Sequence, residues 1–325
     1  MPAEVETPLV VERELLGGDR KYTRLEVAKR AGVSVEHART LWRALGFADV
    51  GDDRVAFTDQ DVEALRAVDG LVQRGIVDAE TQLAMTRAMG QSLARLAEWH
   101  VSAITGALAD RQTIEPDDAA EAAHELVPVV ERLIGYVWRR HLAATAGRAL
   151  ALSSDAPTTS TVVGFADLVG FTSLTRQVDE DQLAELVERF EALAADIVAE
   201  LGGRIVKTVG DEVMFSVDEP AVGAEIALRL AERVHDVEGL PDLRVGLARG
   251  AVLARLGDLY GEPVNIASRL TSIARPGSVL VDREMAAALE DDEQFRLRRL
   301  TPRPVRGYAL LHASRLRRAE AADAD

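Results

Sequence analysis

Three short blocks decide the fold of this chain: Phe165-Ala-Asp-Leu-Val-Gly-Phe-Thr172, Lys207-Thr-Val-Gly-Asp-Glu-Val-Met-Phe215 and Asp258-Leu-Tyr-Gly-Glu-Pro-Val-Asn-Ile-Ala-Ser-Arg269. Each block sets a few polar residues among apolar ones, in stretches with the periodicity of a strand or a helix. All three lie within Thr161–Arg269, and the rest of the chain is organised around that segment.

The first block predicts a strand that ends at Asp167 and passes through Gly170 into a helix beginning near Thr172. Such a turn presents backbone N–H groups that suit a polyphosphate, and a carboxylate at the end of a strand suits a hard divalent cation. The alternative for Asp167 alone is an ordinary turn or helix-start residue, and for an isolated Asp that alternative is the better one.

The second block supplies a partner for Asp167. Gly202-Gly203 ends a helix, Arg204–Val209 alternates as a strand, Gly210-Asp211 makes a turn, and Val213–Val217 returns as the neighbouring strand. An Asp in a hairpin turn is common for conformational reasons alone. Two such carboxylates at strand ends, however, could hold two metal ions roughly 3.5 to 4 Å apart, the arrangement that activates an attacking hydroxyl.

The third block places Asp258 in a turn and begins a helix at Pro263. Asn265 and Arg269 are four residues apart, so they share one face of that helix. An Asn and an Arg at this spacing are usually part of a solvated surface, and that alternative stays open on spacing alone.

The order of strand, helix, hairpin, helix and strand from Thr161 predicts an α+β fold with a ferredoxin-like core and extra strands. Beyond the third block, we expect a strand at Ser278–Val281 and a helix at Glu284–Leu289. Phe295–Leu300 and Val305–Leu311 are expected to close the sheet as a strand pair.

Together the three blocks resemble the catalytic domain of a class III nucleotidyl cyclase, specifically an adenylyl cyclase. The resemblance implies that Asp167, Asp211 and the backbone carbonyl of Leu168 bind two divalent metal ions, Mg²⁺ or Mn²⁺. It implies that Asn265 orients the ribose of ATP and that Arg269 stabilises charge on the α-phosphate.

The same resemblance assigns Lys207 and Asp258 to the adenine base. An ammonium donates to adenine N1 and a carboxylate accepts from the N6 amine, whereas guanine reverses this pattern, so ATP is the expected substrate. Phe171 and Thr172, in the turn of the first block, are also expected to contact the nucleotide. The alternative for Lys207 is an exposed strand lysine.

The expected reaction converts ATP to cyclic AMP and pyrophosphate, in a homodimer with two composite active sites, because in this family the two subunits share each site. The chain departs from the family in two ways. The segment from Gly250 to Asp258 is short, which puts a dimer-clasping arm in doubt, and Ala251 stands where many relatives carry an Arg. Arg255 is a candidate replacement on the phosphates.

Composition narrows the class of protein. The chain has 325 residues, 47% hydrophobic and 28% charged, no cysteine and a formal net charge of −16. These values are typical of a globular protein of two domains, and the absence of cysteine excludes thiolate metal ligands and fits a cytoplasmic location. No apolar run of about 18 residues predicts a membrane span. The negative charge argues against affinity for nucleic acid or anionic lipid.

Residues 1–150 are predicted to form an all-helical regulatory domain. Within it, residues 22–60 resemble the helix-turn-helix of a MerR-type module, with Ser34 capping the second helix, a small wing at residues 45–57, and a further helix capped by Thr58–Asp61. A DNA reader places basic side chains on its second helix. Arg39 and Arg43 lie there beside Glu36, so a nucleotide-sensing DNA-binding regulator is the alternative function, and nucleic acid is an unlikely partner.

Helical periodicity continues to Leu150, with breaks expected near Gly75 and Asp78, at Asp110–Asp118 and at Pro128. An apolar stripe predicts a buried bundle helix, or alternatively an apolar ligand pocket: Leu83, Met85, Met89, Leu93, Leu96, Trp99 and Ile104. Residues 151–160 are expected to be a linker, 161–317 the catalytic domain, and 318–325 a disordered acidic tail.

This layout resembles the pH-sensing, autoinhibited adenylyl cyclases. The resemblance implies that the helical domain regulates catalysis, with protonation shifting the balance between an assembled and a misaligned dimer. Three histidines of the helical region titrate in the useful range, although each is also typical of a solvated helix surface: His100, His124 and His141.

Overall fold

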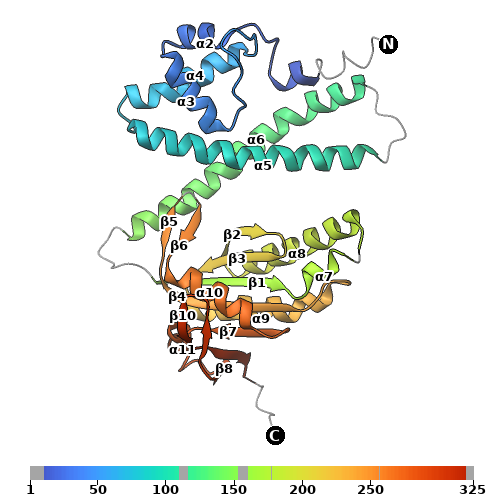
Figure 1. The fold of residues 1–325 in the computed structure, drawn as a ribbon, viewed down its shortest axis with the longest axis vertical. Helices are drawn as coiled ribbons and strands as arrows, with labels where there is room; N and C mark the ends of the chain where they lie inside the picture. The colour runs from blue at the N-terminus through green and yellow to red at the C-terminus, as the bar shows by residue number, and fades with distance from the viewer. Residues whose placement is uncertain (1–10, 110–115, 153–159, 177, 256, 320–325) are drawn as a thin grey trace. The chain divides into compact units, whose positions relative to one another are not determined.

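The structure is a computed structural model that describes residues 11–109, 116–152, 160–176, 178–255 and 257–319. The chain divides into two compact units, Met1–Ala149 and Leu150–Asp325 (Figure 1). The acidic tail beyond residue 319 and most of the expected linker lie outside the described residues. No helix in the described part of the chain is both long and apolar enough to cross a membrane.

The first unit begins with the expected helix-turn-helix. Helix α2, Arg24–Ala31, is capped by Thr23 and ends at Gly32, which adopts the left-handed conformation at φ 79°. Ser34 accepts a hydrogen bond from the amide of His37 and starts α3, Val35–Leu45. Helix α4, Asp59–Gln73, begins at a capping box of Thr58 and Asp61. These helix starts confirm the predictions, because each cap satisfies a backbone donor that the helix leaves free.

The wing between α3 and α4 is different from the expectation. Residues 47–56 contain no strand, and the segment is joined to the start of the unit by one isolated bridge between Tyr22 and Phe57. The ring of Phe57 stacks on Trp42, with centroids 4.4 Å apart. The segment is therefore held by side-chain packing and by ion pairs of Asp49 and Asp52 with arginines of α2 and α3, rather than by a strand ladder.

Two long helices follow, α5 at Ala79–Ala109 and α6 at Pro116–Leu152. The break expected at Pro128 was wrong, since α6 continues through that residue. A proline inside a helix removes one backbone hydrogen bond, and the several helical turns on either side of Pro128 tolerate that loss. The break near Gly75 and Asp78 is confirmed, and residues 110–115 lie outside the description.

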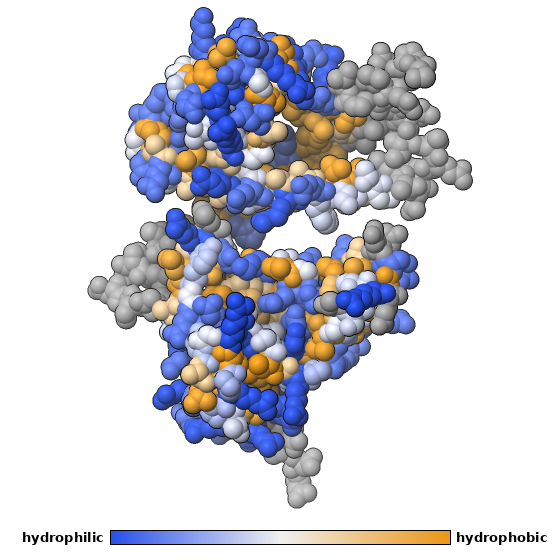
Figure 2. Space-filling model, viewed as in Figure 1, coloured by the Kyte–Doolittle hydropathy of each residue, from blue (hydrophilic) through white to orange (hydrophobic). Residues whose placement is uncertain are grey.

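Much of the apolar stripe of α5 is exposed in this chain, although Leu83 packs against the small core of the first unit. Met85, Met89 and Trp99 are 52%, 48% and 61% exposed. The buried face is instead Gln82, Thr86 and Gly90, because α5 approaches α3 so closely that a Cβ on Gly90 would lie 2.4 Å from the carbonyl oxygen of Leu45. Figure 2 shows apolar residues open to solvent on this unit.

The second unit is built on a seven-stranded sheet in the order β2-β3-β1-β4-β7-β11-β8. Its first four strands have the antiparallel order of a ferredoxin-like core, which confirms the predicted fold class. Their bounds are β1 Ser160–Leu168, β2 Arg204–Val209, β3 Glu212–Val217 and β4 Leu243–Ala251. Helices α8, Glu180–Glu200, and α9, Pro220–Arg233, cover one face, and α10, Glu262–Ile273, covers the other.

Strand β1 shows why both faces need cover. Val162, Ala166 and Leu168 pack into the core under α8 and α9. Val163 and Phe165 alternate with them and pack on the side of α10. A strand buried on both faces is apolar throughout, so Asp167 at its end is an exception that requires an explanation.

The closing strands pair differently from the prediction. Strand β7, Ser278–Val281, and helix α11, Arg283–Ala288, lie where we expected them. Strand β8, Phe295–Arg299, pairs with β11, Ser314–Arg318, rather than with residues 305–311. The intervening segment forms a hairpin of its own, β9 Arg303–Val305 with β10 Tyr308–Leu311, because Gly307 at φ 90° allows a tight turn.

Candidate active site

The two predicted metal carboxylates lie at neighbouring strand ends. Asp167 is near the end of β1 and is 9% exposed, and Asp211 occupies the turn between β2 and β3 after Gly210 at φ 62°. The backbone N–H of Leu168 donates to the carbonyl of Asp211 at 3.1 Å, which ties the turn to β1. Burial raises the pKa of Asp211, and the charge of Asp167 raises it further. The two carboxylates therefore face the same space.

A third carboxylate, which was not predicted from the sequence, lies beside these two. Glu212 lies directly opposite Asp167 in the pairing of β3 with β1. Burial raises the pKa of Glu212 to about 7, and the charges of Asp167 and Asp211 contribute to the rise. The signal was available, because residues opposite each other on antiparallel strands share a face, but the register was not known from the sequence.

Arg244 balances this negative charge and was also missed. It lies on β4 opposite Asp167, and its Nε donates to Asp167 Oδ2 at 2.5 Å. Its Nη1 donates to the backbone carbonyl of Ser272 at 3.4 Å, in the last turn of α10. The guanidinium of Arg244 thus stands against a carboxylate that the sequence assigned to a metal ion.

The oxygen donors fit a divalent cation. The described residues contain no group of three or more His, Cys, Asp and Glu side chains arranged to hold a metal ion by themselves. Mg²⁺ is usually held by one or two carboxylates together with water and substrate phosphates, so Asp167 and Asp211 are a sufficient protein contribution. The cation would replace the guanidinium of Arg244 at Asp167.

The predicted base-binding pair is assembled within one chain. Lys207 Nζ, from β2, lies 2.6 Å from Asp258 Oδ2. Asp258 is the first residue of β6, Asp258–Tyr260, directly after a hairpin turn from β5, Leu253–Arg255, and not within the turn itself. Burial opposes ionisation of Asp258, but hydrogen bonds from Lys207 and from the Leu259 amide outweigh it and lower its pKa.

Asn265 and Arg269 lie on α10, whose position is set by a close contact with the sheet. A Cβ on Gly246 of β4 would lie 2.4 Å from the carbonyl oxygen of Ala267, so only glycine allows α10 to lie this near. Asn265 is exposed and Arg269 partly exposed. Among the described residues, no hydrogen bond or ion pair joins their side chains to Asp167 or Asp211. Within one chain, the described residues therefore show no polar link between the pair on α10 and the two carboxylates.

The structure gives less support to the three other residues that were predicted to contact the nucleotide. Phe171 begins the four-residue helix α7, Phe171–Leu174, and its side chain packs against the core under α8 and α9. The side chain of Thr172 lies outside the described residues. Arg255 is exposed at the end of β5, opposite Asp258 in the strand pairing, so it borders the base-binding pair.

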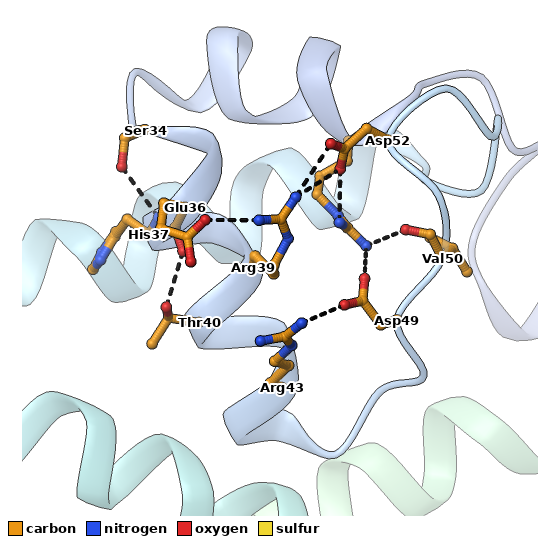
Figure 3. A network of polar contacts seen from close by, with 10 residues as sticks. Ser34, Glu36, His37, Arg39, Thr40, Arg43, Asp49, Val50 and Asp52 are labelled. Carbon is orange, nitrogen blue, oxygen red and sulfur yellow. Dashed lines mark hydrogen bonds and ion pairs between the residues drawn. The ribbon is translucent and has the colours of Figure 1, made fainter.

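The two arginines on the second helix of the helix-turn-helix are already paired within the fold. Arg39 is paired with Asp52 and Glu36, and Arg43 with Asp49 at 2.6 Å (Figure 3). Arg24, which is 4% exposed, contacts both aspartates as well. Guanidinium groups that are committed to carboxylates within the fold are not available to DNA phosphates, which weakens the DNA-binding alternative.

Comparisons with known proteins show the family of the chain. Residues 154–316 match the adenylate and guanylate cyclase catalytic domain, and residues 3–145 match the adenylate cyclase regulatory domain. An adenylate cyclase of Streptomyces coelicolor is 46% identical over 297 residues, which cover 89% of this chain and 77% of that protein. A pH-sensitive adenylate cyclase of Mycobacterium tuberculosis is 33% identical over 316 residues, covering 92% and 79%.

Among solved structures, the adenylyl cyclase CyaB from P. aeruginosa aligns with 50% of this chain and 95% of its own, at 20% identity and a TM-score of 0.45. The family matches and the two bacterial relatives span both units of the chain. The chain therefore belongs to the class III adenylate cyclases, with an adenylate cyclase regulatory domain preceding its catalytic domain.

Proposed function

We propose that this protein converts ATP to 3′,5′-cyclic AMP and pyrophosphate, with each active site shared between two copies of the chain. The observation that carries the proposal is the contact of Lys207 with Asp258 at 2.6 Å. It places a cation and a carboxylate side by side, in the arrangement that reads the N1 and N6 edge of adenine.

Base selection follows from donors and acceptors. The ammonium of Lys207 has only donors, and the ionised carboxylate of Asp258 has only acceptors. Adenine offers an acceptor at N1 beside a donor at N6, so both residues are satisfied when their mutual ion pair opens around the base. Guanine presents the reverse order, so the ammonium would face the N1 donor and the carboxylate would face the O6 acceptor. The pair therefore discriminates against GTP.

Asp167, Asp211 and the carbonyl of Leu168 would hold two divalent ions, Mg²⁺ or Mn²⁺. When bound, these ions would lower the pKa of the ribose 3′-hydroxyl and neutralise charge on the triphosphate. The chain contributes carboxylates at fixed strand ends, which orient the nucleotide so that the 3′-hydroxyl faces the α-phosphate in line with the departing pyrophosphate.

Asn265 and Arg269 would complete the site from the partner subunit. Asn265 would orient the ribose, and Arg269 would stabilise the charge that develops on the α-phosphate as the new bond forms. Support comes from the absence, in the described residues, of any side-chain hydrogen bond or ion pair between this pair and Asp167 or Asp211. Since one chain carries both halves, a homodimer has two equivalent sites.

The exposed apolar residues of the regulatory unit also support a dimer. Trp138 is 62% exposed and Leu133 56% on α6, and Trp99 is 61% exposed on α5. A single protein chain in water rarely leaves so many large apolar side chains uncovered along two helices. A second copy would bury them.

Mixing two inactive variants tests the shared site. Asp167→Ala removes one half of a site and Arg269→Ala the other, so each homodimer should be inactive. A mixed dimer retains one intact site of two, and random mixing gives about a quarter of the wild-type sites. Recovery of roughly that activity supports the proposal. Mixed dimers that form, as shown by differently tagged chains, and yet stay inactive would contradict it.

A further inference from the structure

Four arginines gather on one face of the last two strands of the sheet. In the pairing of β11 with β8, Arg315 lies opposite Arg298 and Arg317 opposite Arg296. The residues between them, Leu316 and Leu297, point the other way and pack into or against the core. Because side chains alternate along a strand, all four arginines share the opposite face. We call Arg296, Arg298, Arg315 and Arg317 the arginine face.

The arginine face has no acidic partner. None of its four residues forms an ion pair in the part of the chain that the structure describes. This holds even for the acidic run Glu290–Glu293, which precedes β8. Arg318, the next residue on β11, shows the contrast, because it points to the other face and pairs with Glu225 at 2.7 Å and Glu232 at 2.9 Å. The carboxylates that pair with β11 therefore lie on the face of the sheet opposite to the arginine face.

Arg315 shows what this arrangement costs. Its Nε is buried and has no hydrogen-bond partner in the described chain. Burial lowers the pKa of Arg315, and the neighbouring charges of Arg317, Arg275 and Arg298 lower it further. Like charges directly opposite each other on paired strands destabilise a sheet. Folding alone therefore gives no reason for this cluster, whereas a bound anion would satisfy it.

The chemistry of the face selects the anion. Planar guanidinium groups bind phosphate oxygens in pairs, and opposite residues on antiparallel strands have Cβ atoms about 4.5–5.5 Å apart. Four such groups can converge on a compact ion that carries several adjacent charges. A membrane or nucleic acid would extend beyond this patch and meet a chain of net charge −16. A small ion lies within about 10 Å of the face and is affected mainly by its local charge.

We propose that the arginine face binds an oligophosphate, a site separate from the active site and independent of the proposed reaction. The strands that build it, β8 and β11, lie at the far edge of the sheet from β2, which carries Lys207 (Figure 1). Pyrophosphate and the triphosphate of a nucleotide both belong to this class. The shared feature is a chain of linked phosphates, and the nucleoside need not contact the face.

Calorimetric titration of the full chain with inorganic tripolyphosphate tests the proposal, with EDTA present so that metal-dependent binding at Asp167 and Asp211 is suppressed. The variant Arg298→Gln with Arg315→Gln should weaken the affinity by at least about 10-fold, since it removes two charge-assisted contacts. The matched control Arg318→Gln should leave the affinity unchanged, although it loses two ion pairs.

Thermal unfolding gives a second readout. Without the anion, the double variant should melt at a temperature equal to or higher than the wild type, because it relieves repulsion, while Arg318→Gln should melt lower. Tripolyphosphate should raise the midpoint of the wild type and not that of the double variant. Three results would overturn the proposal: no saturable binding, equal affinity in the double variant, or loss of binding in Arg269→Gln instead. Preferential retention on phosphatidylserine vesicles would assign the face to a membrane and overturn it too.

Discussion

Replacing Arg244 by Met should make the metal site easier to fill. Arg244 is the cation that contacts Asp167, with Nε 2.5 Å from Oδ2, and its charge partly offsets the rise in the pKa values of Asp211 and Glu212 that burial causes. A metal ion that takes Asp167 must displace this guanidinium. Methionine keeps much of the apolar length of the side chain and removes the competing charge.

The expected magnitude follows from the exposure of the pair. The side chain of Asp167 is 12% exposed and that of Arg244 33%, so the pair lies between the surface and the interior. Exposed pairs contribute about 0.2–1 kcal/mol, and breaking a fully buried one costs about 3–5 kcal/mol. An intermediate value of about 2 kcal/mol corresponds to about 30-fold in affinity. Arg244→Met should therefore bind Mn²⁺ about 30-fold more tightly without nucleotide.

Electron paramagnetic resonance of free Mn²⁺ measures this affinity without relying on activity. In EDTA the variant should unfold at a lower urea concentration than the wild type, because three carboxylates then repel one another, and Mn²⁺ should restore more stability to it. Arg244→Lys, which keeps the charge, is the control. If Arg244→Met binds Mn²⁺ no more tightly than wild type, the guanidinium does not compete with the metal and the reasoning fails.

Three further predictions concern the base, the core and the pH response. Lys207→Ala should lower kcat/KM for ATP by about 10- to 150-fold, the loss of one charge-assisted hydrogen bond of about 1.5–3 kcal/mol, while Thr208→Val on the same strand should not; similar kinetics for both would refute the base-binding role. Asp282, which is 5% exposed, has its pKa raised by burial from 3.8 to about 6, so the titration of this one group should cost the wild type about 3 kcal/mol of stability as pH rises from about 4 to about 6 and past it. Asp282→Asn keeps the cap on the Met285 amide and should abolish that loss in urea unfolding; an unchanged pH dependence would exclude Asp282 as its source. Replacing His100, His124 and His141 together by glutamine should alter the dependence of activity on pH between pH 5 and 8. An identical pH profile would exclude these histidines as the source of pH control.

Local chemistry made part of the fold predictable. Gly210-Asp211 forms a turn because glycine accepts a positive φ, and Ser34 starts a helix because its hydroxyl caps a free amide, so both could be found in a short window of sequence. The order of elements then sufficed for a ferredoxin-like core. The base-binding pair needed the family resemblance, because Lys207 and Asp258 are far apart in the chain.

The pairing of the strands and the burial of the helix faces could not be predicted in the same way. Arg244 and Glu212 meet Asp167 through strand register, which depends on the whole sheet. Residues 295–299, 303–305, 308–311 and 314–318 form four similar short strands, so nothing local shows that the first pairs with the last. The stripe on α5 has the pattern of a buried helix, but a pattern does not say whether the covering surface belongs to the same chain.

The absence of a side chain at Gly246 has a consequence for control of the enzyme. With Ala267 and Thr271 resting directly on that backbone, α10 has no clearance to slide or rotate on the sheet. Arg269 and Asn265 therefore keep a fixed position relative to the sheet of their own chain. We therefore expect a regulatory switch to move the catalytic unit as a whole rather than α10 alone.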